Sequence, residues 1–158
     1  MRQWYRWGVP VAISLCALSL WGYRATQFIR HNISGSSMTP TLVDGQPVVI
    51  KKKATIQRYD VIAFSVLEEP DLFVKRVIGV PGDAVFLVGS RLVIDLDGTG
   101  QFVTTYSVDL SASLAQRWKG LSEIPDGRYF VLGDQLTVSK DSRSFGWVSA
   151  LRIEGRVE

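Results

Sequence analysis

The 158-residue chain contains one cysteine, Cys16, and one histidine, His31. A single cysteine cannot form an intrachain disulfide or a cysteine-based metal site. The single histidine likewise excludes zinc enzymes that use two or three histidine ligands. A hydrolase with a Ser-His-Asp triad would have to place its whole mechanism on His31, so the sequence disfavours histidine-dependent catalysis.

The chain also has little net charge. The net charge is +3, and the basic residues are scattered along the chain. Their one run, residues 51–53, fits a solvated loop, with contact to anionic lipid as the second interpretation. Nucleic-acid binding is therefore not expected. The 46% apolar composition is sufficient for the core of one domain.

Charged residues are missing from Trp7 to Tyr23, a segment of 17 residues bracketed by Arg6 and Arg24. This length is just enough to span a bilayer, and the aromatic residues at both ends are typical of the headgroup layer. A cleavable secretory signal is the alternative, because residues 17–19 have small side chains at a suitable spacing. The apolar run continues beyond them, which favours an uncleaved anchor.

We predict a single-pass membrane protein from this pattern. Arg2, Arg6 and the amino terminus slightly outweigh the arginines that follow the apolar segment, which places the N-terminus in the cytoplasm. The predicted parts are a cytoplasmic N-terminus at residues 1–6, a transmembrane anchor at 7–26 and an extracytoplasmic domain at 27–158.

Short β-rich runs separated by turn signals make up the rest of the chain. They lie at residues 47–50, 60–66, 73–80, 84–88, 92–96, 129–132 and 147–153. This alternation predicts a mostly β domain, folded as a barrel or as packed sheets.

One segment has helical spacing instead. Leu110, Leu114 and Trp118 recur every four residues, which places them on one helical face. Asp109 or Ser111 can cap the N-terminus, and Gly120 can end the helix. We predict one short amphipathic helix that covers a sheet edge.

Two hydroxyls, Ser36 and Ser37, lie between Gly35 and Pro40, a pattern that alone predicts a turn. A later segment, residues 133–146, combines hydroxyls, carboxylates and an arginine between two predicted strands. By itself this segment is a polar surface loop. It also contains a hydroxyl able to orient an amine and an Asp-Arg pair able to hold the loop.

Lys75 and Arg76 interrupt an otherwise apolar strand. Because neighbouring side chains point to opposite faces of a strand, one of these cations should face inward. Burial disfavours the ammonium form of lysine, and a neutral amine can remove a proton from a serine hydroxyl. A Ser-Lys dyad is therefore one interpretation, and an edge strand with both cations in solvent is the other.

Taken in order, four segments resemble the sequence boxes of the type I signal peptidases. They are residues 37–41, 58–64, 75–83 and 133–146. The resemblance implies a signal-peptidase-type antiparallel β domain in a bacterial cell membrane. It implies a serine endopeptidase that removes signal peptides from secreted preproteins after small residues, with signal peptides and the lipid bilayer as partners and no metal ion or other cofactor.

The same resemblance implies the roles of the site residues. Ser37 is the nucleophile, Lys75 is its general base, and Ser139 orients the Lys75 amine. The backbone N–H of Ser37, helped by the turn at Gly35, holds the oxyanion. The residues corresponding to the family's structural polar groups are Arg76, Asp134, Asp141 and Arg143. Ile33, Met38 and the strand from Phe73 to Ile78 are candidates to line the substrate pockets.

The chain departs from the family pattern at two positions. Tyr59 stands where the family usually has glycine, and Gln135 where it usually has asparagine. Neither position transfers the proton, so the departures concern loop geometry. The glycine at position 35 and the short domain resemble the Gram-positive enzymes.

Two other functions compete with this interpretation. Self-cleaving repressors also use a Ser-Lys dyad, here separated by 75 − 37 = 38 residues, but they normally have a soluble DNA-binding domain in place of an apolar anchor. A signal-peptidase-like assembly factor, or a peptidase dedicated to pilin-like substrates, is the second alternative. The presence of both Ser37 and Lys75 favours catalysis, and the oligomeric state stays open.

Overall fold

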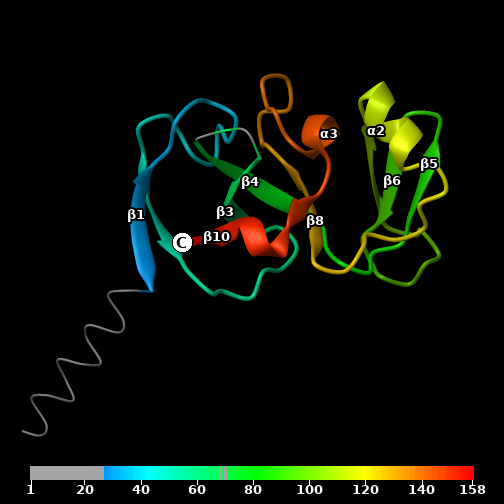
Figure 1. Ribbon diagram of the computed structural model, residues 1–158, viewed down its shortest axis with the longest axis horizontal. Coiled ribbons are helices and arrows are strands. Elements are labelled where there is room, and N and C mark those ends of the chain that lie inside the picture. The colour runs from blue at the N-terminus through cyan, green and yellow to red at the C-terminus, as the bar shows by residue number, and fades with distance from the viewer. Residues whose placement is uncertain (1–26, 68, 70) are drawn as a thin grey trace, which may run out of the picture.

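The computed structural model describes residues 27–67, 69 and 71–158 of the chain (Figure 1). The predicted cytoplasmic residues 1–6 and the predicted anchor at residues 7–26 lie outside this part. Within the described residues, no helix has both the length and the apolar composition needed to cross a membrane.

Ten strands and three short helical segments form the described part. The strands are β1 (Phe28–Asn32), β2 (Pro47–Lys51), β3 (Val61–Ser65), β4 (Leu72–Gly79), β5 (Val85–Val88), β6 (Arg91–Asp95), β7 (Thr105–Asp109), β8 (Arg128–Leu132), β9 (Val148–Ser149) and β10 (Ile153–Val157). The helices are α2 (Ala112–Arg117), α3 (Ser142–Phe145) and the 3₁₀ helix η1 (Ala150–Arg152).

The strands form two antiparallel sheets. The larger sheet has the order β1-β2-β10-β3-β4-β8-β9, and the smaller has the order β5-β6-β7. The small sheet and α2 lie at the opposite end of the molecule from β1 (Figure 1). The prediction of a mostly β, antiparallel domain is therefore confirmed.

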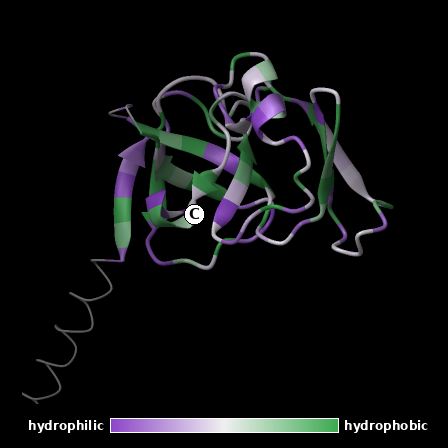
Figure 2. Cartoon of the chain, turned by 45° about the vertical axis from the view of Figure 1, so that its right-hand side comes forward, coloured by the Kyte–Doolittle hydropathy of each residue, from purple (hydrophilic) through white to green (hydrophobic). Residues whose placement is uncertain are grey.

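Three buried apolar clusters hold these elements together. One joins the small sheet and α2 to β8, the second packs β3 and β4 against β8 and β9, and the third joins the turn that follows β1 to β2, β3 and β4. Hydrophobic residues dominate the strands, whereas polar residues gather in the connections (Figure 2). The third cluster contains Ile33 and Met38, so it anchors the segment that contains Ser37.

The predicted amphipathic helix is present as α2. Its N-cap is Ser111, whose side chain accepts a hydrogen bond from the Leu114 N–H, and Leu114 and Trp118 are buried as expected. Trp118 stacks on Trp147 with ring centroids 3.8 Å apart. The prediction of a single helix missed α3, because a four-residue helix is too short to show a period.

The predicted strand at residues 147–153 is wrong. The chain forms β9 at the sheet edge, turns through η1, and only then enters β10, which lies between β2 and β3. Two other strands, β1 and β7, were missed. Both are edge strands with alternating half-buried and exposed residues, so they lack the apolar run that marks an inner strand.

Tyr59 adopts a left-handed backbone conformation with φ of 72°. Its N–H donates to the Val77 carbonyl, and its own carbonyl accepts from Arg76, so the backbone is held in place on both sides. An L-residue pays a steric cost in this conformation that glycine avoids. Glycine, which the resemblance implies at this position, adopts this conformation without strain.

We expect Tyr59→Gly to stabilise the protein by about 1 kcal/mol, because it removes this strain while losing little packing from a side chain that is 54% exposed. Thermal or chemical denaturation measures the change. Tyr59→Ala is the matched control, since alanine removes the same side chain and keeps the strain. Equal stability of the glycine and alanine variants would contradict the explanation.

Candidate active site

Ser37 lies in the turn between β1 and β2. The turn is closed by the Ile33 N–H, which donates to the Gln46 carbonyl at 2.9 Å, and by the Gly35 N–H, which donates to Asp44 Oδ1 at 2.8 Å. Gly35 has φ of 86°, a left-handed conformation in which glycine is unstrained. Met38 is buried beneath the turn, so the Ser37 hydroxyl is presented from a fixed backbone.

Lys75 points inward from β4, as one of the two adjacent cations was predicted to do. The residue is only 4% exposed. Its Nζ lies 2.7 Å from Ser37 Oγ and 2.9 Å from the carbonyl oxygen of Val74. The structure therefore brings the two predicted catalytic side chains, one from β4 and one from the turn after β1, into direct contact.

Burial lowers the pKa of the Lys75 amine from its ordinary value, because desolvation disfavours the ammonium form. The charges of Asp141 and Asp134 act in the opposite direction and only partly offset this effect. The ring of Phe73, on the same face of β4, lies 5.6 Å from Nζ and covers the amine. The surroundings of Lys75 thus favour a neutral amine within hydrogen-bonding distance of one hydroxyl.

Arg76 points to the other face of β4 and joins three segments. Its Nε and Nη2 donate to both carboxylate oxygens of Asp134 at 2.9 and 2.8 Å. It also donates to the Tyr59 carbonyl and to the Thr41 hydroxyl. Burial pushes the pKa of Asp134 upward, but the hydrogen bonds from Arg76 and Thr41 outweigh burial and lower this pKa overall. Asp134 is therefore an ionised partner of Arg76.

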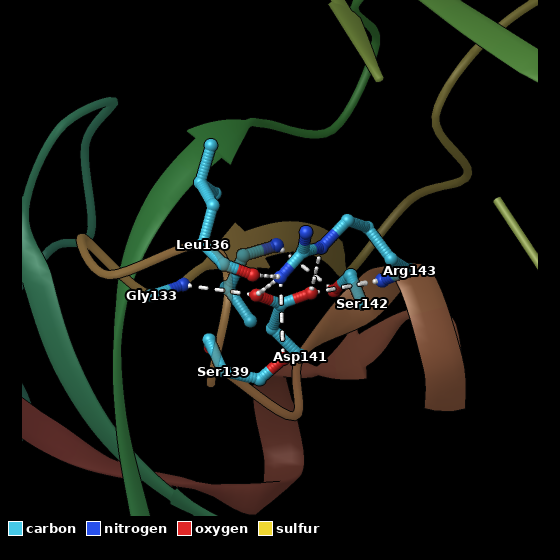
Figure 3. A network of polar contacts seen from close by, with 7 residues as sticks. Gly133, Leu136, Ser139, Asp141, Ser142 and Arg143 are labelled. Carbon is cyan, nitrogen blue, oxygen red and sulfur yellow. Dashed lines mark hydrogen bonds and ion pairs between the residues drawn. The ribbon is translucent and has the colours of Figure 1, made fainter. Parts of the chain in front are cut away.

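Asp141 and Arg143 form the second ion pair (Figure 3). Asp141 is fully buried, and Arg143 donates to its two carboxylate oxygens at 2.8 and 2.9 Å. Asp141 also accepts the Gly133 N–H, while Arg143 donates to the carbonyls of Leu136 and Ser139. The pair thereby holds both ends of the loop from residue 133 to residue 141.

This loop packs on the backbone of Ser37. The Gln135 N–H donates to the Ser37 carbonyl at 3.0 Å. A side chain at Gly133 would collide with both Ser139 and the Ser37 carbonyl, so glycine is needed for this close approach. The contact from position 135 uses the main chain and the Gln135 side chain is exposed, so glutamine, where the resemblance implies asparagine, is compatible with the contact.

The expected hydrogen bond between Ser139 and Lys75 is absent from this structure. Ser139 Oγ is buried and has no hydrogen-bond partner among the described residues, although it lies beside Gly133, next to the Ser37 backbone. The carbonyl of Val74 orients the amine instead. Sequence patterns cannot reveal this partner, because every residue has a backbone carbonyl.

The N–H of Ser37 makes no hydrogen bond within the part of the chain that the structure describes. It is therefore available to a ligand oxygen. The Gly35 N–H, in contrast, is used by Asp44. Gly35 thus shapes the turn and does not offer its own N–H to an oxyanion.

A cleft of about 400 Å³ leads to the two side chains. One wall runs from the end of β1 through the Ser37 turn, and the other is the first half of β4. β1 is the last strand of its sheet, and β4 pairs with β8 only from Arg76 onward, so both walls have unpaired strand edges. The predicted lining residues Ile33, Met38 and Phe73 lie in the cleft, whereas Ile78 belongs to the core beneath the small sheet.

A further ion pair, between Arg58 and Asp83, was not predicted. Arg58 donates to both carboxylate oxygens of Asp83 at 2.7 Å and to the Ile78 carbonyl. It joins the start of β3 to the end of β4 and so fixes the strand that contains Lys75. The two residues are 25 positions apart, and no local pattern links them.

Comparisons with known proteins agree with this geometry. The family model described as "Signal peptidase, peptidase S26" matches residues 3–158. Signal peptidase IB of Staphylococcus aureus is 32% identical over 176 aligned residues, which cover 99% of this chain and 88% of the relative. Signal peptidase I of Bacillus caldolyticus is 31% identical over 175 residues, covering 97% of this chain and 87% of the relative.

A crystal structure of a signal peptidase I from Enterococcus faecalis is 30% identical and covers 66% of this chain and 98% of its own, with a TM-score of 0.44. The family assignment rests on the sequence matches. Because the family model and the relatives extend over almost the whole chain, the chain belongs to the signal peptidase family, peptidase S26, and is a serine peptidase of the type I signal peptidase kind.

Proposed function

We propose that this peptidase is bound to the membrane and removes signal peptides from secreted preproteins by a Ser-Lys dyad, with Ser37 as nucleophile and Lys75 as general base. The observation that carries the proposal is the 2.7 Å contact between Lys75 Nζ and Ser37 Oγ at a buried position. Removal of signal peptides is the activity of the family. The identity of the dyad and its chemistry are our inference from this contact.

The proton path follows from the two contacts of the amine. An ammonium group at Lys75 donates to both Ser37 Oγ and the Val74 carbonyl. Once neutral, the amine keeps one N–H on the Val74 carbonyl, and its lone pair faces Ser37. It then accepts the hydroxyl proton as Oγ attacks the scissile carbonyl, and returns this proton to the leaving amine.

The negative charge that develops on the substrate oxygen needs donors fixed in advance. The Ser37 N–H is free within the described residues, and the carbonyl of the same peptide plane, that of Ser36, is held by the Thr39 N–H at 3.0 Å. Loss of one such donor typically costs about 10² to 10³ in rate. In this proposal Gly35 contributes by shaping the turn, and Arg76, Asp134, Asp141 and Arg143 contribute by keeping the turn, β4 and the loop together.

The unpaired strand edges of the cleft suit an extended peptide. A substrate strand placed between β1 and the first half of β4 gains backbone hydrogen bonds on either side. Its alternate side chains then face the apolar residues Ile33, Met38 and Phe73 of the cleft lining. We infer that small side chains are selected by this apolar lining near Ser37.

The anchor rests on the sequence at residues 7–26, which precede β1 directly. The end of β1 lines the cleft, so an anchored chain holds its site close to the bilayer and to an emerging signal peptide. We propose that residues 1–6 are cytoplasmic and that residues 27–158 are extracytoplasmic.

Membranes washed with alkaline carbonate should retain the full chain, and its release would contradict the anchor.

The dyad predicts the effect of removing either side chain. Ser37→Ala and Lys75→Met should each lower kcat for a synthetic signal-peptide substrate by about 10⁴-fold or more, since neither the attack nor the proton transfer has a substitute. The measurement uses purified full-length enzyme. Ser107→Ala and Lys51→Met, at exposed positions distant from the cleft, are matched controls that should retain activity. Normal cleavage by either dyad variant would refute the mechanism.

The lowered pKa of Lys75 predicts the pH dependence of kcat. Because the neutral amine is the active form, kcat should rise about tenfold per pH unit below this pKa and level off above it. The plateau should begin at a lower pH than an ordinary lysine allows. A rate that is constant from acidic to neutral pH would contradict a lysine base.

Ser139→Ala tests the positioning role implied by the resemblance. If Ser139 Oγ turns toward the amine during the reaction, this variant should lower kcat while KM and the rising limb of the pH profile stay in place. An unchanged kcat would remove Ser139 from the mechanism and leave the Val74 carbonyl as the only orienting group.

A further inference from the structure

The turn between β6 and β7 has a regular pattern of oxygen-containing side chains. Asp95, Asp97 and Thr99 occupy alternate positions, and Gly100 follows them. Calcium loops of the form D-x-[DN]-x-[DN]-G place ligands at the same first, third and fifth positions, ahead of a glycine at the sixth. A sequence pattern of this length occurs by chance, so the geometry has to decide its meaning.

Asp95 has an oxygen that nothing satisfies. The side chain is fully buried, and its Oδ2 accepts the Gly100 N–H at 2.6 Å. Its Oδ1 has no hydrogen-bond partner among the described residues. Burying a carboxyl oxygen without a hydrogen-bond partner is costly, so Oδ1 points to a ligand that completes it. The bond to Gly100 directs the carboxylate into the loop.

The remaining oxygens of the loop are also fixed. Asp97 Oδ1 accepts from the Thr99 hydroxyl at 2.6 Å and from the Thr99 N–H at 3.0 Å, and Oδ2 accepts from the Thr104 N–H. The Thr99 hydroxyl in turn accepts the Gln101 N–H at 3.1 Å. Asp97 is thus held in a fixed orientation, two positions along the chain from a second acidic residue, Asp95.

The described residues offer Asp95 no ion pair. Arg58 is the cation whose charge interacts with it, but all hydrogen bonds of the Arg58 guanidinium go to Asp83 and to the Ile78 carbonyl. Gly100, with φ of 73°, lets the chain curl back so that its N–H reaches Asp95. The loop thus holds two acidic side chains, neither of which forms an ion pair with the described residues.

We propose that residues 95–100 form a calcium site in which Asp95 Oδ1, the Asp97 carboxylate and the Thr99 hydroxyl are ligands. Backbone carbonyls and water supply the rest of the shell. Oxygen ligands and a variable coordination number are what calcium prefers, whereas magnesium demands a strict octahedron. No three His, Cys, Asp or Glu side chains gather within the described residues, so the site depends on a hydroxyl and on main-chain oxygens.

The affinity should be modest. Only two carboxylates contribute, and the bidentate glutamate that ends a high-affinity loop is replaced by Tyr106 at the twelfth position. A dissociation constant of about 10⁻⁴ to 10⁻³ M, as in extracellular calcium modules, is expected. The loop lies in the small sheet, away from Ser37, so the predicted effect is on stability and not on the chemistry of cleavage.

The test measures calcium binding by the full-length, chelator-treated protein in detergent. Two methods are used, calorimetric titration with CaCl₂ and thermal unfolding. Binding should saturate in the millimolar range, and calcium at ten times its dissociation constant should raise Tm by about 3 to 5 °C. MgCl₂ at the same ionic strength should produce a clearly smaller rise.

Asp97→Asn and Thr99→Val should abolish most of this response, because they alter exposed ligands without disturbing the core. Asp126→Asn, which removes an exposed carboxylate in another turn, is the matched control and should respond like the unaltered protein. Asp95→Asn should also lose the response if it folds. The absence of saturable binding, an equal response to magnesium, or an undiminished response in Asp97→Asn would overturn the proposal.

Discussion

The proposed chemistry depends on one contact, the 2.7 Å approach of Lys75 Nζ to Ser37 Oγ in a place that water hardly reaches. The two residues come from different elements, a strand within the sheet and a turn at its edge. Neither element alone would fix the distance. The large sheet positions β4, and the apolar cluster beneath Met38 positions the turn, so the contact is a product of the whole fold.

The two ion pairs near the site have an electrostatic as well as a mechanical role. Asp134 and Asp141 are the carboxylates whose charges raise the pKa of Lys75, and each is bound through both oxygens by an arginine. Pairing with Arg76 and Arg143 places a positive charge beside each carboxylate, which opposes the field of that carboxylate at the amine. Burial can then dominate and lower the pKa of the amine even beside two acidic residues.

Alternation along a strand was enough to predict that one of two adjacent cations faces inward, and the resemblance identified it as Lys75. The edge strands β1 and β7 escaped prediction because half of each is solvated. The pairing of Arg58 with Asp83 and the orientation of the amine by the Val74 carbonyl depend on tertiary contacts. Ser139 is the reverse case, since the resemblance implied a bond that this structure lacks.

The most direct test of the account is to measure the ionisation of Lys75 itself by NMR. The protein is labelled with ¹³C and ¹⁵N at lysine, and the Lys75 signals are assigned from their loss in Lys75→Arg. The account predicts that the Lys75 signals titrate at a clearly lower pH than those of the exposed lysines, because burial lowers the pKa from the ordinary value of 10.5. Titration of Lys75 together with the exposed lysines would contradict the neutral base.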